Sequence, residues 1–348
     1  HQHKNMFVTS RSYAHGVLGL RPDDRTFSVS KLFFAYGLGN GMYFPLSVGA
    51  STVLNPDRPK PAGVAELVAR HRPTVFFAVP TFYAALLRQV DQGLRADFSS
   101  LRLAISAGER LPPEIFSQFH KRFGLEILDG IGSTEMLQMF LSNRPGEARM
   151  GSCGVEVPNY EARIVGERGQ SVETGNIGDL WVKGPSAFAG YWNKPELTAR
   201  TKVDNWVLTG DKFFRDADGY YHYCGRSDDM LKVSGMWVSP MEVENLLLGH
   251  SQVAEAAVVG LPDAIGLVRP VAFVVLRAGN EAGLQAERDI QEFVRTQIAS
   301  YKCPQEIRFL KELPKTATGK IQRFRLRESA GAPSSTNSVG GPAEKRQR

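Results

Sequence analysis

The sequence predicts an α/β protein, in which a large, mostly parallel sheet with a β subdomain is followed by a small α+β domain. Between residues 62 and 128, apolar runs of strand length alternate with segments in which apolar side chains recur every three or four positions. That alternation is typical of a parallel sheet covered by helices on both faces. From residue 151 to 206 the runs shorten and turns multiply, and after residue 228 the pattern becomes α+β.

The elements of the large sheet follow from local patterns. We expect helices at residues 62–70, 80–90 and 112–123. In the third helix, Ile115, Phe119 and Phe123 fall four residues apart, and Gly124 provides the stop. Apolar runs predict buried strands at residues 74–79, 101–106 and 125–128. Residues 1–25 are polar and receive no assignment.

The β subdomain and the small domain are predicted in the same way. Ser239 is a predicted N-cap, with Pro240 at the first helical position. Residues 216–219 predict a turn that leads into a strand. Further strands are expected at residues 160–165, 179–182, 221–223, 256–260, 271–276 and 306–310, and a helix at residues 287–298. Residues 330–348 are rich in Ser, Gly and Pro, which predicts disorder.

Two polar clusters follow predicted strands, at residues 106–110 (SAGER) and 129–135 (DGIGSTE). In open α/β sheets, ligands bind beyond the carboxyl ends of the strands. The second cluster has glycines for close backbone approach, two hydroxyls and a carboxylate, a set that suits a phosphate and its metal ion. The alternative is an ordinary β-to-α turn, in which Ser133 or Thr134 caps a helix.

The apolar, glycine-rich segment at residues 31–41 (KLFFAYGLGNG) has two interpretations. Its glycines do not form a dinucleotide-binding fingerprint. One interpretation is a buried segment in which glycine permits close packing. The other is a flat apolar slot, with Phe34 and Tyr36 as walls and Ala35 and Gly37 leaving room for a ligand.

Composition narrows the class of protein. The chain is 42% hydrophobic, its formal charge is +6, and it contains no apolar run near the roughly 20 residues that a membrane helix needs. Basic residues are not clustered among aromatic ones, so a nucleic-acid partner is not expected. The three widely separated cysteines and the lack of a signal peptide favour the cytoplasm.

Four motifs occur in a fixed order over more than a hundred residues. They are Thr209-Gly210-Asp211, Gly225-Arg226-Ser227-Asp228-Asp229, Lys232-Val233-Ser234-Gly235, and residues 314–320 (PKTATGK). By spacing alone, the first three describe a surface hairpin that joins a helix. Their identity and order resemble the acyl-adenylate-forming superfamily, and residues 31–40 and 129–143 most resemble benzoate-CoA ligases.

The resemblance implies a role for each matching residue. The adenylation lysine matches Lys320, the α-phosphate contact Thr134, and the Mg²⁺ ligand Glu135. The hinge position matches Asp228. Residues that would bind the nucleotide or coenzyme A are Gly108, Glu109, Arg110, Asp129, Gly130, Ile131, Asp211, Arg226 and Gly235. Residues that would line the aryl pocket are Phe34, Ala35, Tyr36, Gly37 and Gln138.

The resemblance also implies a domain plan. Residues 1–227 match the later part of a large AMP-binding domain, residues 228–328 a small mobile domain with the hinge and the catalytic lysine, and residues 329–348 a disordered tail. The chain opens with His1, and the superfamily's phosphate loop falls upstream of that point. The expectation is therefore a remnant of the large domain, with weak or no activity by itself.

The activity implied is an AMP-forming acid–thiol ligase. A benzoate or substituted benzoate reacts with ATP and Mg²⁺ to give an acyl-adenylate, and transfer to coenzyme A yields the aryl-CoA thioester. Gln138 stands where benzoate ligases typically have histidine, so benzoate, a hydroxybenzoate and 2-aminobenzoate all stay open.

Two other functions stay open: loading of a carrier protein, and a truncated chain that binds nucleotide without turnover. The expected partners are the aryl carboxylate, ATP and coenzyme A, with no membrane and no nucleic acid. A homodimer, and a lysine acetyltransferase acting on Lys320, stay open as protein partners.

Overall fold

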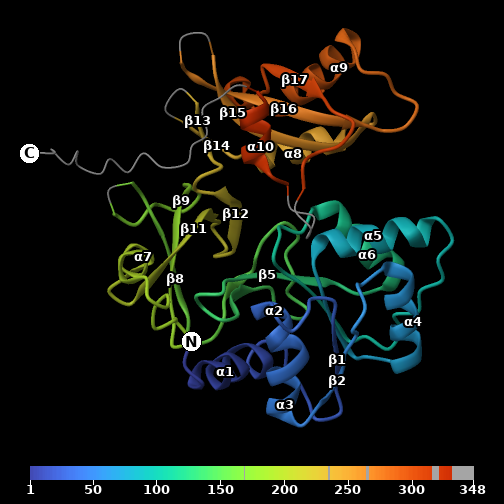
Figure 1. The fold of residues 1–348 in the computed structure, drawn as a ribbon, viewed down its shortest axis with the longest axis vertical. Coiled ribbons are helices and arrows are strands. Elements are labelled where there is room, and N and C mark those ends of the chain that lie inside the picture. The colour runs from blue at the N-terminus through green and yellow to red at the C-terminus, as the bar shows by residue number, and fades with distance from the viewer. Residues whose placement is uncertain (168, 234–235, 264–265, 316–320, 331–348) are drawn as a thin grey trace, which may run out of the picture. The chain divides into compact units, whose positions relative to one another are not determined.

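The computed structural model describes residues 1–167, 169–233, 236–263, 266–315 and 321–330. The chain divides into two compact units, unit 1 (His1–Ser227) and unit 2 (Asp228–Arg348), shown in Figure 1. The predicted α/β class is confirmed, with a largely parallel sheet and a β subdomain in unit 1 and an α+β domain in unit 2. No helix in the described ranges is both long and apolar enough to cross a bilayer.

A seven-stranded sheet forms the centre of unit 1, in the order β2-β1-β3-β4-β5-β6-β7. The strands from β2 to β5 run parallel, whereas β6 and β7 are antiparallel to their neighbours. Their bounds are β1 (Arg25–Ser28), β2 (Ser51–Val53), β3 (Val75–Ala78), β4 (Leu103–Ser106), β5 (Ile127–Gly132), β6 (Met139–Ser142) and β7 (Val155–Glu156).

Helices lie on both faces of this sheet (Figure 1). One face is covered by α4 (Pro61–His71), α5 (Pro80–Asp91) and α6 (Pro113–Phe123). The other carries α1 (Lys4–Thr9), a π-helical turn (Ser10–His15), α2 (Ala35–Leu38), a second π-helical turn (Gly39–Tyr43) and α3 (Phe44–Val48).

Successive side chains of each strand point to opposite faces and so enter two different cores. Phe76 is fully buried with Tyr83 and Phe119, on the side of α5 and α6. Its neighbour Phe77 is fully buried with Tyr13 on the other side. This double burial explains why the strands read as continuous apolar runs in the sequence.

The strand predicted at residues 125–128 begins later and runs further, as β5. The chain does not turn into a helix after it: the next element is the antiparallel strand β6, so the alternative interpretation, a β-to-α turn with a capped helix, is wrong. A Cβ on Gly130 would lie 2.7 Å from the Leu141 carbonyl oxygen, and one on Gly132 would lie 2.6 Å from that of Gln138. These glycines therefore allow the two strands to approach.

A second, antiparallel sheet completes unit 1, as predicted for the β subdomain. Its order is β10-β11-β9-β8, and β12 also pairs with β11. The bounds are β8 (Glu161–Val165), β9 (Gly178–Lys183), α7 (Pro195–Thr201), β10 (Lys202–Val203), β11 (Trp206–Arg215) and β12 (Tyr221–Arg226). In the predicted turn, Asp216 Oδ1 accepts hydrogen bonds from the backbone N–H groups of Asp218 and Tyr220 at 3.0 and 2.8 Å.

Unit 2 is built on a three-stranded sheet in the order β15-β16-β17. Its elements are β13 (Leu231–Val233), β14 (Met236–Val238), α8 (Pro240–Gly249), β15 (Val253–Pro262), β16 (Val268–Leu276), α9 (Leu284–Arg295), a 3₁₀ turn (Ser300–Lys302), β17 (Glu306–Phe309) and α10 (Arg323–Ser329). The Ser239 hydroxyl accepts a hydrogen bond from Glu242 N–H at 3.3 Å, which confirms the N-cap. Helix α10 was not predicted, and it contains Ser329, where the disordered tail was expected to begin.

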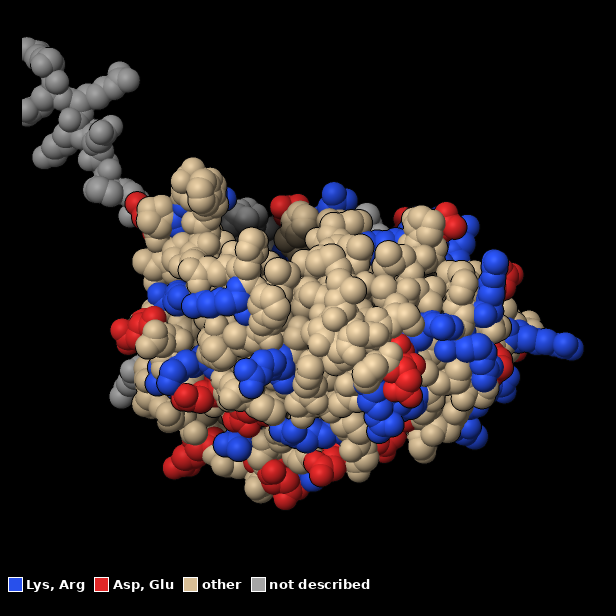
Figure 2. Space-filling view, turned by 90° about the horizontal axis from the view of Figure 1, so that it is seen from below, with Lys and Arg blue, Asp and Glu red and all other residues tan. Residues whose placement is uncertain are grey.

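The cysteines form no disulfide, and charges of both signs are interspersed on the face shown in Figure 2. Cys153 and Cys224 are buried in unit 1, Cys303 is partly exposed in unit 2, and all three are free. On the face shown in Figure 2, the described Lys and Arg side chains alternate with Asp and Glu and with uncharged surface. No extended basic patch forms among the residues visible there.

Candidate active site

The turn between β5 and β6, residues 133–138, carries three of the predicted site residues. Thr134 is exposed and Glu135 is half-buried, whereas Gln138 is 3% exposed. The Met136 N–H group donates a hydrogen bond to the Ser133 hydroxyl at 3.3 Å, which closes the turn. The hydroxyl and carboxylate proposed for phosphate and metal thus stand at one end of the turn, and the amide proposed for the aryl pocket stands at the other.

The Gln138 amide joins this turn to the predicted pocket segment. Its Nε2 lies 3.1 Å from the Tyr36 carbonyl oxygen and 3.4 Å from that of Ala35. It is also 3.4 Å from Asn40 Oδ1, and Gln138 Oε1 accepts the Met139 N–H at 3.1 Å. Residues separated by a hundred positions in the sequence are therefore brought together here.

Tyr36 and Phe34, the two predicted walls, lie in different environments. The Tyr36 ring packs edge-on against Phe77, with centroids 6.2 Å apart, and burial raises the pKa of its hydroxyl well above the ordinary value. Phe34 is 46% exposed and contacts Phe33. Gly37 is buried, and a Cβ there would lie 2.1 Å from the Lys31 carbonyl oxygen, so this close packing requires glycine.

Asp129 lies in the buried part of β5, beside Ser106 of β4. Burial raises the pKa of its carboxyl to about 8, although Ser106, the backbone N–H groups of Leu111 and Gly130, and Arg110 all act in the opposite direction. The nearby groups include Arg110 and Leu111, so the loop that carries the predicted nucleotide residues Gly108, Glu109 and Arg110 passes beside this carboxyl. Gly108 has a φ of +89°, which favours glycine.

Asp211 and Arg226 face each other across β11 and β12. Arg226 Nη1 lies 3.0 Å from Asp211 Oδ1 and donates to the Thr209 carbonyl oxygen at 2.9 Å. The buried Cys153 thiol, whose pKa burial raises well above its usual value, is close enough to Asp129, Arg110 and Asp211 for their charges to affect it. The predicted nucleotide-binding residues Arg110, Asp129 and Asp211 therefore lie in one region of unit 1.

Sequence reasoning missed a contact at Glu135. The Tyr191 hydroxyl donates to Glu135 Oε1 at 2.6 Å, and burial followed by the hydrogen bond to this carboxylate raises the pKa of Tyr191. The two residues are 56 positions apart, and Tyr191 belongs to no periodic pattern, so no local signal could have found the contact.

The donors present at the turn fit a magnesium ion. Within the described ranges, no group of three or more His, Cys, Asp and Glu side chains gathers to form a dedicated metal cage. Mg²⁺ is commonly held by one or two carboxylates together with substrate phosphates and water. A single half-buried carboxylate beside the Thr134 hydroxyl matches that donor set.

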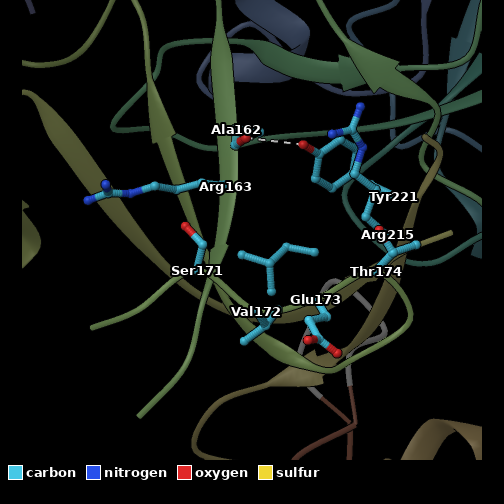
Figure 3. A pocket seen from close by; sticks show the side chains of 9 residues that line it. Ala162, Arg163, Ser171, Val172, Glu173, Thr174, Arg215 and Tyr221 are labelled. Carbon is cyan, nitrogen blue, oxygen red and sulfur yellow. Dashed lines mark hydrogen bonds between the residues drawn. The ribbon is translucent and has the colours of Figure 1, made fainter. Parts of the chain in front are cut away.

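Two cavities of unit 1 lie in the β subdomain. The one in Figure 3 has a volume of about 190 Å³ and is crossed at one side by the hydrogen bond from the Tyr221 hydroxyl to the Ala162 carbonyl oxygen, 3.1 Å long. The other, about 490 Å³, lies beside Trp181 and Gly210. Neither cavity is lined by a predicted site residue.

Three predicted residues belong to unit 2. Asp228 is exposed and is the first residue of unit 2. Gly235 and Lys320 lie outside the described residues. Their predicted roles depend on the sequence motifs alone.

Two protein-family models match this chain. Residues 1–192 match the model of the AMP-binding enzyme family, and residues 242–320 match that of the AMP-binding enzyme C-terminal domain. A benzoate–CoA ligase of Thauera aromatica is 49% identical over 330 residues, which cover 94% of this chain and 62% of the relative. The chain thus spans about three fifths of that relative's length.

Two solved structures are similar over nearly the whole chain. A benzoate CoA ligase from Burkholderia xenovorans LB400 has a TM-score of 0.86 and 49% identity, covering 94% of this chain and 66% of that one. An anthranilate CoA ligase in complex with anthranoyl-AMP has a TM-score of 0.87 and 45% identity, covering 95% and 64%. Since the first family model alone covers more than half of the sequence, the chain belongs to the AMP-binding enzyme family.

Proposed function

We propose that this chain serves the ATP-dependent ligation of a benzoate-type acid to coenzyme A, with AMP and pyrophosphate as the other products. The carrying observation is the contact between Gln138 Nε2 and the Tyr36 carbonyl oxygen, 3.1 Å long. It joins the aryl-pocket segment to the turn that bears Thr134 and Glu135. A ring held at residues 34–37 then has its carboxylate directed toward a nucleotide held at that turn.

The first half-reaction needs no enzymic nucleophile, because the substrate carboxylate attacks the α-phosphorus and pyrophosphate leaves. The protein's task is to bring anions together and to stabilise the charge that develops on phosphate oxygens. Thr134 contacts the α-phosphate in this proposal, and Lys320 supplies a positive charge. Glu135 would hold Mg²⁺, which when bound neutralises phosphate charge.

The second half-reaction brings the coenzyme A sulfur to the carbonyl carbon of the acyl-adenylate and releases AMP. In the proposal, Asp228 is the hinge that moves the small domain, replacing Lys320 with the Gly235 segment at the reaction centre. Asp228→Pro is expected to spare adenylate formation and to block thioester formation. Equal loss of both half-reactions would contradict the hinge role.

In this proposal the acid substrate is benzoate or a hydroxy or amino derivative of benzoate. Similarity to benzoate and anthranilate ligases supports this class. The Gln138 amide is engaged by backbone groups and by Asn40, so it positions the pocket segment while leaving room for a substituted ring. Gln138→His is expected to change the ratio of kcat/KM values among the three acids more than the rate on any single acid.

The experiment measures acid-dependent pyrophosphate release and then thioester formation. It uses this chain alone and this chain joined to the part of the Thauera aromatica relative that it does not cover. Thioester formation from benzoate supports the proposal. Adenylate without thioester would favour a carrier protein as the acceptor, and neither product across the acid panel would favour a chain that only binds nucleotide.

Two further features belong to the proposal. Acetylation of Lys320 would remove the charge that adenylation uses, so acetylated protein with full adenylation activity would contradict the role of this lysine. The free thiols of Cys153, Cys224 and Cys303 are compatible with a reducing compartment, which supports a cytoplasmic location.

A further inference from the structure

The Glu135 carboxylate is held asymmetrically. Tyr191 donates to Oε1 at 2.6 Å, whereas Oε2 takes no hydrogen bond from the residues that the structure describes. The backbone of Glu135 is held by the same segment, since its carbonyl oxygen accepts the Phe188 N–H at 2.8 Å. One side-chain oxygen is therefore occupied and the other is left available.

Residues 186–191, the segment that carries Tyr191, are held by buried contacts. The Ser186 side chain is fully buried, and its hydroxyl donates to the Met136 carbonyl oxygen at 2.7 Å. The Tyr160 hydroxyl lies 2.6 Å from the same Ser186 Oγ, and Asn5 Nδ2 donates to the Ser186 carbonyl oxygen at 3.0 Å. The segment is therefore hydrogen-bonded to the turn next to Glu135.

Tyr191 itself is anchored at its backbone and at its ring. Its N–H donates to the Thr198 hydroxyl in α7 at 2.9 Å. The ring packs edge-on against Phe188, with centroids 4.8 Å apart. The phenol hydroxyl thus reaches Glu135 from a preorganised position, so little rotamer freedom is lost when the hydrogen bond forms.

We propose that Tyr191 is a positioning residue, which occupies Oε1 of Glu135 and so presents Oε2 alone to the divalent cation of the nucleotide substrate. The inference rests on the proposed function, in which Glu135 is the metal ligand. Carboxylates that bind metals are commonly held by such outer hydrogen bonds, and losing one costs about 10–100-fold in metal affinity. Mg²⁺ is demanding because it requires near-ideal octahedral geometry.

The test is Tyr191→Phe, which removes the hydroxyl and keeps the ring against Phe188. Binding of Mn²⁺ in the presence of ATP, followed by electron paramagnetic resonance of the free ion, is expected to weaken about 10–100-fold. The Mg²⁺ concentration that half-saturates adenylation is expected to rise by a similar factor, while kcat at saturating Mg²⁺ changes less than about twofold. Unchanged Mn²⁺ affinity in the variant would overturn the inference.

Tyr160→Phe is the matched control, because it removes a buried phenol hydroxyl that contacts Ser186 of the same segment without touching Glu135. It is expected to lower the melting temperature but to leave Mn²⁺ affinity within about twofold. If both variants weaken the metal equally, the role of Tyr191 is general support of the segment, and the inference is wrong.

Glu135→Gln separates the inference from the proposed function. In that background, adding Tyr191→Phe is expected to change Mn²⁺ affinity no further, because residues that act through one another are not additive. Full additivity would overturn the positioning role. If the unsubstituted protein does not bind Mn²⁺ in the presence of ATP, both the proposed metal site and the inference are wrong.

Discussion

Arg323 donates hydrogen bonds to both oxygens of the buried Glu244 carboxylate, from Nη2 to Oε1 at 2.9 Å and to Oε2 at 2.8 Å. Glu244 also accepts the Val258 N–H at 2.7 Å. The pair therefore ties α10 to α8 and β15 within unit 2. Burial raises the pKa of Glu244, and the charge of Arg323 opposes that shift. The ionised form of the Glu244 carboxyl is therefore stabilised by the charge of Arg323.

Arg323→Met is expected to destabilise unit 2 by about 3–5 kcal/mol, because it leaves the Glu244 carboxylate buried without its counter-charge. The measurement is urea denaturation, followed by hydrogen exchange of β15. Arg295→Met is the control: Arg295 pairs with Glu292 at the surface, both side chains are 62% exposed, and the expected loss is about 0–1 kcal/mol. Equal losses from the two variants would contradict the buried-pair interpretation.

Asp216 gives unit 1 an acid-sensitive contact. Burial alone would raise its pKa, but hydrogen bonds from His222, the Tyr220 N–H and Arg149 outweigh it and lower the pKa to about 2. Since an unfolded Asp titrates near 3.9, the contact stabilises the fold fully above that pH and is lost as the pH falls toward 2.

Asp216→Asn is therefore expected to lower the melting temperature at neutral pH and to flatten its decline between about pH 5 and 2. The measurement is the melting temperature against pH for both proteins. Asp218→Asn, at a side chain that is 68% exposed, removes the same formal charge beside Arg149. That control is expected to change stability by less than about 0.5 kcal/mol. A wild-type decline that persists in Asp216→Asn would refute the assignment.

Asn143 holds β5 against the loop that follows β6. Its Nδ2 donates to the carbonyl oxygens of Asp129 and Ser152 at 2.9 and 2.8 Å, and its Oδ1 accepts the Arg149 N–H at 2.9 Å. Asn143→Leu leaves the Ser152 carbonyl oxygen and the Arg149 N–H without these side-chain partners, each at a cost of about 1–3 kcal/mol, whereas the Asp129 carbonyl oxygen keeps the Asn143 backbone N–H at 2.9 Å. We expect severe destabilisation of unit 1 in calorimetry. Asn143→Asp, which restores only the acceptor, should lose less, and the reverse order would argue against this account.

Gly37 and Gly63 make a matched pair of glycine positions. A Cβ at Gly37 would lie 2.1 Å from the Lys31 carbonyl oxygen and 2.5 Å from that of Ser30, whereas a Cβ at Gly63 in α4 would meet nothing within 4 Å. Gly63→Ala is expected to stabilise by about 0.4–1 kcal/mol, because it restricts the unfolded chain and relieves a helix glycine. Gly37→Ala is expected to destabilise and to raise KM for the aryl acid, since it displaces Tyr36. Thermal melts and steady-state kinetics would reveal any departure from these opposite signs.

The sequence predicted elements wherever the controlling interactions are local. The Ser239 cap is an example, because the hydroxyl and the N–H that it accepts are three residues apart. The end of β5 was misplaced because it depends on pairing with β6, and a pattern of residues within one strand carries no information about its partner. The same limit applies to α10, whose single buried residue, Leu326, gives no periodic signal.

The candidate site shows the same difference between local and long-range interactions. Motifs identified Glu135 and Gln138, since each belongs to one continuous stretch that matches a family. Tyr191 was missed because its contact spans 56 residues and it lies in none of the motifs that carry the family resemblance. The burial of Asp129 was also not predicted, because a carboxyl placed by the sequence just after a strand is expected to be solvated, whereas β5 continues to Gly132 and Asp129 is buried within it.

The placement of the three cysteines allows the opening of unit 1 to be timed against a partly exposed thiol of unit 2 in one sample. Cys153 and Cys224 are buried in unit 1, and Cys303 is partly exposed in unit 2. Only an accessible thiolate reacts with an alkylating reagent, so modification of a buried thiol requires the surrounding structure to open. Mass spectrometry of tryptic peptides after timed alkylation would therefore record the lifetime of unit 1 at two thiols and the accessibility of unit 2 at a third, without any engineered label.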